Sequence, residues 1–268
     1  FELVAADIGQ GTAVLVRTRR HLLLYDAGPL YSPEADAAGR VLLPLLRARG
    51  ERRIDLLMLS HRDTDHVGGA ASLLAAVPVA AISSSLATDH PLLARGLPHR
   101  RCDAGQGWVW DGVRFDVLHP LPADHERATR ANAVSCVLRV QGAGGSALLS
   151  GNIEAAQEAA LVSRAGGQLR ADMLLVPHHG SRTSSTPAFI DAVQPRVAVV
   201  QAAYRSRFGH PAPAVEARYR ARGVAFERSD ACGAWTLPAA GTPRCERQSA
   251  RRYWQHPGPG PAAVTAAP

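Results

Sequence analysis

The chain has 268 residues, of which 46% are apolar and 20% are charged. These ordinary globular values exclude wholesale disorder, and the length allows one large domain or two small ones. No apolar run reaches the roughly 18 residues that a membrane-spanning helix needs. The formal net charge is +7 and all 30 basic residues are arginine, a weak indication of affinity for polyanions.

Predicted strands and helices alternate along the chain. Apolar runs bounded by turn residues predict strands at 13–17, 21–26, 54–59, 79–82, 108–110, 113–118, 134–140, 146–149, 173–176 and 196–201. Helical periodicity and caps predict helices at 40–49, 68–76, 154–164, 213–222 and from Pro187, with Thr186 as its N-cap. This order favours an α/β fold in which helices cover β-sheets.

The chain divides into one domain and a tail. Residues 1–241 contain no internal repeat and are expected to form one domain. Residues 242–268 are rich in Arg, Pro, Gly and Ala, which predicts a disordered or loosely attached terminus. The chain starts at Phe1, with neither an initiator methionine nor a signal peptide, so we expect it to be a piece of a larger protein.

The four cysteines show no CxxC pair, so a cysteine zinc site is not expected. Cys232 and Cys245 would close a short loop in an oxidising compartment. The alternative is four free thiols.

Segment 60–66, SHRDTDH, contains the densest group of possible metal ligands and directly follows a predicted buried strand. A loop at a strand end can aim several side chains at one point, and imidazole and carboxylate donors suit a divalent cation. The alternative, a solvated loop with chance charges, is disfavoured by four ligands in this spacing: His61, Asp63, Asp65 and His66.

Two more polar segments follow predicted strands. Adjacent His178 and His179 point in different directions, so we expect one to bind metal and the other to orient a neighbour or contact substrate. Asn152, in the segment SGNIE, is a weak neutral ligand where a carboxylate would bridge two ions, and we expect it to cap the following helix. Asp26, in an earlier turn, is expected to brace a metal-bearing loop.

His210 lies in a basic and aromatic segment with Tyr204, Arg205 and Arg207. Such a segment suits contacts with phosphates and bases. The alternative is that His210, which precedes a proline, is structural.

The strand-ending motifs occur in the order HxDxDH, GN and HHGS, within the segments DIGQGTAVLVRT, LLLYDAG, LSHRDTDHVGG, LLSGNIE, LLVPHHGSRTSS and RFGHP. Together they resemble the metallo-β-lactamase superfamily and, within it, the C-terminal domain of the ComEC family of competence proteins. The resemblance runs from Asp7 to Leu237. It implies an αββα sandwich, with two mixed sheets flanked by helices and a metal site at one edge.

The resemblance also implies a function. Members are expected to be metal-dependent nucleases that degrade the non-transported DNA strand during natural transformation, on the extracytoplasmic (periplasmic) face of the inner membrane. Single-stranded DNA and the membrane channel and OB-like domains of the same full-length protein are the implied partners. The fragment is expected to be monomeric, without a small-molecule cofactor. This location would permit a Cys232–Cys245 disulfide.

The resemblance assigns roles by position. Asn152 replaces a bridging aspartate, and Asn132 and Ser135 stand where many members have another ligand histidine. Two divalent ions are implied, and the oxygen-rich ligand set favours Mn²⁺, with Zn²⁺ or Mg²⁺ as alternatives. The implied metal ligands are His61, Asp63, Asp65, His66, Asn152 and His178, and the implied catalytic residues are Asp65, His179 and His210.

Two other functions compete with the nuclease. Asn152 is consistent with a DNA-binding domain that has lost turnover. A small-molecule hydrolase of the same superfamily, such as a lactamase or thioesterase, is disfavoured by Asp63, by the absence of a histidine at 132–135 and by the basic charge.

Overall fold

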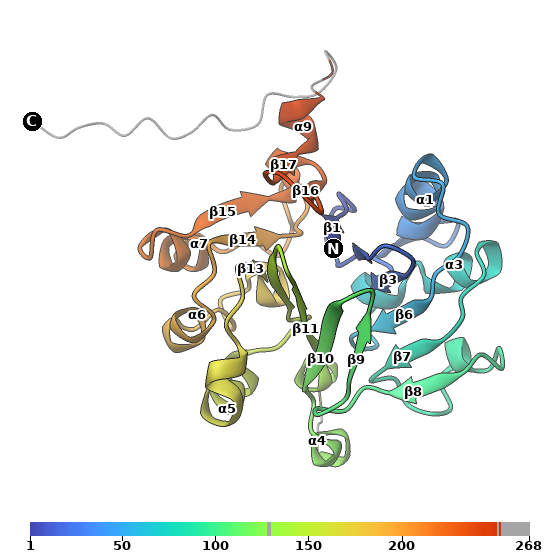
Figure 1. Cartoon of the computed structure of the whole chain (residues 1–268), viewed down its shortest axis with the longest axis horizontal. Coiled ribbons are helices and arrows are strands. Elements are labelled where there is room, and N and C mark those ends of the chain that lie inside the picture. Colours follow the sequence, from blue (N-terminus) through green and yellow to red (C-terminus); the bar gives the residue numbers. More distant parts are fainter. Residues whose placement is uncertain (128–129, 251, 253–268) are drawn as a thin grey trace, which may run out of the picture.

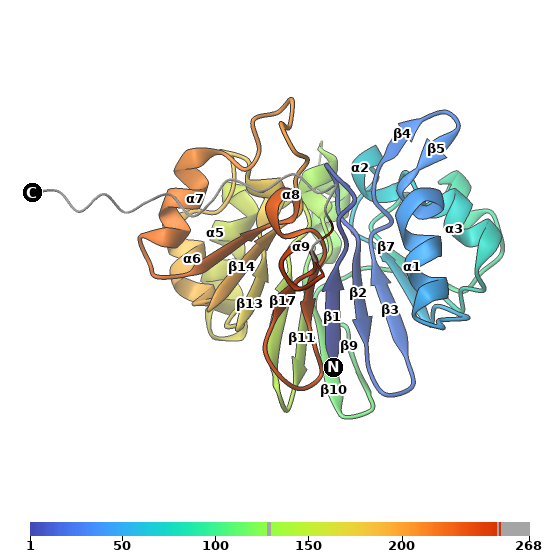
Figure 2. The ribbon, with the colours of Figure 1, turned by 90° about the horizontal axis from the view of Figure 1, so that it is seen from above.

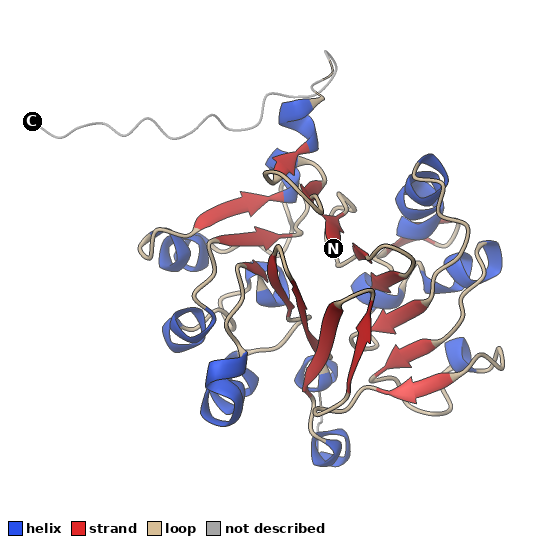
Figure 3. Ribbon diagram, viewed as in Figure 1, coloured by secondary structure: helices blue, strands red, loops and turns tan. Residues whose placement is uncertain are grey.

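The structure is a computed structural model that describes residues 1–127, 130–250 and 252. Two mixed β-sheets face each other at its centre (Figures 1 and 3). The first has the strand order β17-β16-β1-β2-β3-β6-β7-β8. It comprises β1 Glu2–Ala5, β2 Val14–Arg17, β3 Leu22–Tyr25, β6 Leu56–Leu59, β7 Ile82–Ser84, β8 His99–Arg101, β16 Trp235–Leu237 and β17 Arg244–Cys245. Strands β3, β6, β7 and β8 are parallel, and the other pairs are antiparallel.

The second sheet has the order β15-β14-β13-β12-β11-β10-β9. It comprises β9 Gly107–Trp110, β10 Val113–His119, β11 Val137–Gly142, β12 Gly145–Leu149, β13 Met173–Leu175, β14 Val197–Val200 and β15 Ala225–Arg228. Strands β12 to β15 are parallel, and β9 to β12 form antiparallel hairpins. The turn Asp111-Gly112 joins β9 to β10, as the sequence predicts.

Helices cover the outer face of each sheet (Figures 2 and 3). The first sheet carries the π-helical turn η1 Ala38–Leu42, α1 Leu43–Ala48 and α3 Ala70–Ala76, and the second carries α5 Ala155–Ala165, α6 Pro187–Val193 and α7 Pro213–Arg220. Shorter elements are α2 Thr64–Val67, α4 Pro122–Arg127, α8 Ser229–Cys232, α9 Glu246–Ser249, the β4 Leu30–Ser32 and β5 Ala35–Asp36 hairpin, and the turns η2 Pro91–Leu93, η3 Ala131–Val134, η4 Gly166–Gln168 and η5 Pro177–Gly180. The predicted αββα sandwich is confirmed.

The central strands are apolar on both faces because both faces are buried. In β3, Leu23 and Tyr25 face the core between the sheets, whereas Leu22 and Leu24 face the helices. Layered burial of this kind explains why the strand sequences read as continuous apolar runs rather than as alternating ones.

Some sequence expectations need correction. The strand predicted at 79–82 begins only at Ile82, and Val79 makes a single bridge to Ile54. Within the predicted tail, residues 244–249 form the short elements β17 and α9. Residues 251 and 253–268 of that tail lie outside the described residues. No helix in the described ranges is long and apolar enough to cross a membrane.

His119, at the end of β10, is a buried histidine outside the candidate site. Its Nε2 donates to the Ala133 carbonyl at 2.9 Å, and Arg164 donates to its Nδ1 at 3.2 Å. Burial lowers the pKa of His119 to about 4. The folded protein therefore holds this ring neutral where an unfolded chain would protonate it.

Acidification should therefore destabilise the fold through His119. Between pH 7 and 4.5 the unfolded chain binds a proton that folded His119 excludes, which lowers the free energy of unfolding by roughly 2–3 kcal/mol. His119→Gln keeps a donor and an acceptor but removes this titration. Urea unfolding at both pH values should show a smaller loss in the variant; equal losses would contradict the assignment.

Candidate metal centre

The candidate site lies where parallel strands of both sheets end. The loops after β3, β6, β12 and β14 each begin with a polar residue, and the loop after β13 carries His178 and His179 in its η5 turn. The carboxyl ends of parallel strands share one edge, where α/β proteins commonly bind ligands. The site is thus built from loops that two rigid sheets hold in place.

The loop after β6 is fixed by its backbone. Thr12 N donates to the Asp65 carbonyl at 3.0 Å, and Ala27 N donates to that of His66 at 2.8 Å. A Cβ on Gly11 would lie 2.3 Å from the Asp65 carbonyl oxygen, so only glycine permits this approach. The backbone of this loop is therefore held in place, and its Asp65 and His66 side chains face His179, which follows a strand of the second sheet.

Asp65, His66 and His179 converge on one point. His179 Nε2 lies 3.1 Å from Asp65 Oδ2 and 3.3 Å from His66 Nε2, and the remaining pair is 3.7 Å apart. His179 Nδ1 faces the Gln201 carbonyl at 2.9 Å, and His66 Nδ1 faces Asp26 Oδ2 at 2.7 Å. Each acceptor fixes the proton of its imidazole on Nδ1. The Nε2 lone pairs of His66 and His179 and a lone pair of Asp65 Oδ2 therefore face one another.

This donor set fits a divalent cation. Donors at about 2.0–2.2 Å from a tetrahedral ion lie roughly 3.3–3.6 Å from each other, close to the spacing here. Burial lowers the pKa of His66 to about 3, so its Nε2 lone pair is free at neutral pH. A cation would offset the repulsion among these three donors, which otherwise have no shared partner.

A second group of unpartnered donors lies beside the cluster. His61 Nε2 and Asn152 Oδ1 are buried and have no hydrogen-bond partner in the described part of the chain. His61 Nε2 lies 3.5 Å from Asp63 Oδ2. Ser135 Oγ accepts from Asn152 N at 3.1 Å and lies 3.4 Å from His61 Nδ1, which connects the two residues. Burying a polar atom without a hydrogen-bond partner costs folding free energy unless a ligand contacts that atom.

The adjacent histidines have different environments. His179 joins the cluster, not His178 as the sequence suggested; His178 Nδ1 lies 3.2 Å from Thr183 Oγ1 and 3.3 Å from Glu154 Oε1. Both histidines have φ near +50°, a rare conformation for non-glycine residues that functional sites tolerate. This backbone turns only the second ring inward, and sequence spacing does not reveal it.

Asn152 is not the predicted helix N-cap. Glu154 caps α5, and its side chain and that of Gln157 form a capping box. The helix begins later than the sequence suggested, so the Asn152 side chain has no helix-capping bond to make. Its buried Oδ1 remains available to a ligand.

Asp26 braces the loop after β6, as expected. Its carboxylate accepts from Ser60 N and Oγ at 2.6 and 2.7 Å and from His66 Nδ1 at 2.7 Å. Burial raises the pKa of Asp26 to about 7. The carboxylate orients the imidazole from behind, a common outer-shell arrangement in metal sites.

His210 lies near the cluster without joining it. Its ring centroid is 5.8 Å from that of His178. Burial and the neighbouring histidines lower the pKa of His210 to about 4. Gln10 Nε2 donates to its Nδ1 at 3.5 Å, which leaves the proton on Nε2. A neutral ring can donate a hydrogen bond from its Nε2–H but carries no positive charge.

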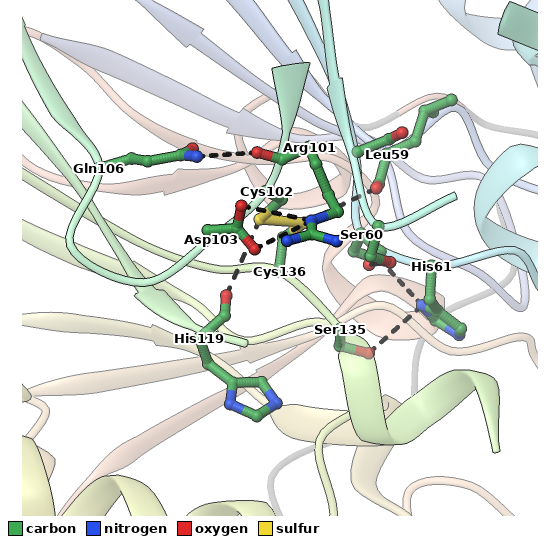
Figure 4. The surroundings of a disulfide bond; sticks show 12 residues. Leu59, Ser60, His61, Arg101, Cys102, Asp103, Gln106, His119, Ser135 and Cys136 are labelled. Atoms are coloured by element: carbon green, nitrogen blue, oxygen red, sulfur yellow. Dashed lines mark hydrogen bonds and ion pairs between the residues drawn. A yellow bond between two sulfur atoms is a disulfide. The ribbon is translucent and has the colours of Figure 1, made fainter. Parts of the chain in front are cut away.

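All four cysteines are paired. Cys232–Cys245 forms, and the free-thiol alternative is wrong. Cys102–Cys136, which the sequence did not suggest, joins the segment after β8 to the start of β11 and so connects the two sheets. Figure 4 shows Ser135, Ser60 and His61 beside it. Cys136 N also donates to the Ser60 carbonyl at 3.0 Å, so this disulfide lies against the metal-bearing loop.

Two supporting residues were missed by sequence reasoning. Gln201 orients His179 through its carbonyl, while its side chain donates to the carbonyls of Ala6 and Ala13 and bridges the sheets. Glu154 holds His178 as well as capping α5. Gln201 is a polar residue directly after β14, which is the signal that identified other site residues, whereas Glu154 lies five residues after β12.

Known proteins show the same fold and related sequences. The sequence profile described as "Metallo-beta-lactamase superfamily" matches residues 6–203. Competence protein ComA of Neisseria gonorrhoeae is 38% identical over 93% of this chain and 34% of its own length. Recombination protein 2 of Haemophilus influenzae is 35% identical over 75% of this chain and 24% of its own length. The chain thus spans about a quarter to a third of these curated relatives.

A solved structure agrees. The metallo-beta-lactamase fold protein YhfI of Bacillus subtilis superposes with a TM-score of 0.58 over 89% of this chain and all of its own, at 12% identity. This likeness shows the fold alone. The similarity to competence proteins that the motifs implied is confirmed by the sequence relatives.

Proposed function

Because this chain belongs to the metallo-beta-lactamase superfamily, we propose that it is a metal-dependent phosphodiesterase that cleaves DNA. Its substrate is the strand that is not transported during natural transformation. The observation that carries the proposal is the convergence of Asp65, His66 and His179 at 3.1–3.7 Å. Similarity to competence proteins supports DNA as the substrate, in agreement with the net charge of +7.

The proposal gives the site residues different roles. Asp65, His66 and His179 would hold one cation, and His61, Asp63 and Asn152 would supply ligands to a second; Mn²⁺ suits this oxygen-rich set. Such ions, when bound, activate water and neutralise phosphate charge. His210 would donate its Nε2–H to a phosphate oxygen, and His178, fixed by Glu154, lies next to the rings of both His210 and His179.

The placement in the cell follows from the same proposal. The domain acts outside the cytoplasm, next to membrane channel and OB-like domains of a longer protein. Two disulfides support an oxidising compartment. The curated relatives, about three times as long as this chain, leave room for such domains.

One observation favours a second function, a DNA-binding domain without turnover. Asn152 carries no charge where two cations would need a bridging anion, so the second cation is held weakly. This candidate predicts salt-sensitive binding of single strands without cleavage.

Asn152→Asp should raise cleavage of single-stranded DNA in Mn²⁺ about tenfold or more over the unchanged chain, because it restores a bridging anion. Asp65→Ala should abolish cleavage. Thermal unfolding provides a second readout: without metal the buried carboxylate lowers the melting temperature, and Mn²⁺ raises it more in Asn152→Asp than in the parent.

The two candidate functions separate cleanly in this assay. Cleavage by the parent or by Asn152→Asp, with none by Asp65→Ala, supports the nuclease. DNA binding by all three without any cleavage supports the binding domain and rejects the nuclease for this chain.

A further inference from the structure

Exposed apolar side chains gather on two loops. Six large hydrophobic side chains are exposed among the described residues, and four of them are Leu30, Tyr31, Tyr204 and Phe208. The first two lie on β4, and the other two lie between β14 and α7. Figure 2 shows both segments projecting from the same side of the sandwich. Such a grouping indicates a binding surface more than scattered exposure does.

These loops enclose a pocket that reaches the metal cluster. A cavity of about 540 Å³ is lined by Leu30, Tyr31, Arg205, Arg207 and Phe208, and also by Asp65. Asp65 is the carboxylate that faces His179 at 3.1 Å. A ligand in this pocket would therefore contact the aromatic loops and the candidate metal centre together.

Arginines lie over the aromatic rings. The Arg205 guanidinium is 5.3 Å from the Tyr204 ring centroid, and that of Arg207 is 4.8 Å from that of Phe208. The guanidinium of Arg40, in η1, lies 5.5 Å from the ring centroid of Tyr31 on β4. Flat rings beside cations match a polyanion whose bases are unpaired, because bases stack on the rings while arginine contacts phosphate.

The row of rings continues inward. The ring centroids of Phe208 and His210 are 5.8 Å apart with planes at 29°. His210 is 5.8 Å from His178, and His178 is 6.4 Å from His179. Two rings, His210 and His178, thus link Phe208 to His179, so a strand stacked on Phe208 would lie near the cluster and the phosphate that is to be cut.

We infer that the pocket lined by Tyr31 and Phe208, with the exposed Tyr204 beside it on the same loop as Phe208, is a base-stacking subsite that selects single-stranded DNA. The inference rests on the proposed function, since it places the substrate of that same site. A paired base in a duplex has its faces covered by its neighbours and cannot stack on these rings. The subsite therefore favours single strands over duplexes.

The test is fluorescence anisotropy with the full chain, without divalent metal, on three probes of equal length: oligothymidylate, the same backbone with abasic sites, and duplex DNA. Phe208→Ala and Tyr204→Ala should each weaken oligothymidylate binding about 5- to 100-fold. Val109→Ala is the matched control, because Val109 is equally exposed, 60%, on β9 outside this pocket. It should change nothing.

The abasic probe separates stacking from charge. We expect the aromatic variants to bind it like the parent, and the parent to prefer oligothymidylate to duplex. Equal binding of oligothymidylate by parent and aromatic variants overturns the inference, as does an equal loss on the abasic probe. A parent that binds none of the probes also overturns it and leaves the surface to a protein partner.

Cleavage in Mn²⁺ is measured in parallel, so the two proposals can fail separately. Cleavage that the aromatic variants retain at low DNA concentration rejects the subsite and keeps the nuclease. Ring-dependent binding without cleavage by parent or Asn152→Asp keeps the subsite and rejects the nuclease.

Discussion

His179→Asn should weaken Mn²⁺ binding by more than about 100-fold, whereas His178→Asn should weaken it by less than about tenfold. Loss of an outer-shell partner typically costs 10–100-fold in metal affinity, and loss of a ligand costs more. Loss of a residue that is neither a ligand nor hydrogen-bonded to one should cost less. His179 Nε2 lies in the cluster, whereas His178 Nδ1 contacts Thr183 and Glu154. Isothermal titration of both variants against the parent measures the difference.

Asparagine is a suitable replacement at both positions. It tolerates the left-handed backbone near φ +50° that both histidines adopt. Its side-chain N–H can still donate a hydrogen bond to the Gln201 carbonyl, which in the parent accepts one from His179 Nδ1. A His178 variant that loses metal as severely as the His179 variant would return the ligand role to His178.

Removing the Cys102–Cys136 disulfide should lower the free energy of unfolding by roughly 4 kcal/mol. The two cysteines are 34 residues apart, and closing a loop of that length restricts the unfolded chain by about this amount. Such a loss is a large fraction of the roughly 5–15 kcal/mol that holds a domain folded. Urea unfolding of the Cys102→Ala, Cys136→Ala double variant measures it.

The second disulfide supplies the control. Cys232 and Cys245 are 13 residues apart, so their removal should cost less, roughly 3 kcal/mol. Because Cys136 donates its backbone N–H to Ser60, removal of Cys102–Cys136 should also weaken metal binding. Equal metal affinity in the two double variants would show that the cross-sheet disulfide does not support the loop.

The sequence predicted the layers and the site segments because both depend on local patterns. Buried strands such as β6 are apolar runs, and the polar residues after them, such as His61, are where parallel strands end. The edge strands β8, β15 and β17 are short and half exposed, so they carry little of this signal.

The sequence predictions that failed concern features that depend on tertiary geometry. The choice between His178 and His179 is made by two consecutive left-handed residues. The Asn152 cap failed because α5 starts at Ala155. Cys102 and Cys136 meet only because the two sheets stack, a contact that spacing along the chain cannot reveal.

A metal centre at this cluster is tested by isothermal titration of the unchanged chain, stripped of metal, with Mn²⁺ and then Zn²⁺. We expect saturable binding of at least one ion per chain, and we expect Asp65→Ala to remove it because this variant lacks one of three converging donors. No binding of either ion by the parent, or undiminished binding by Asp65→Ala, would contradict a metal centre at Asp65, His66 and His179.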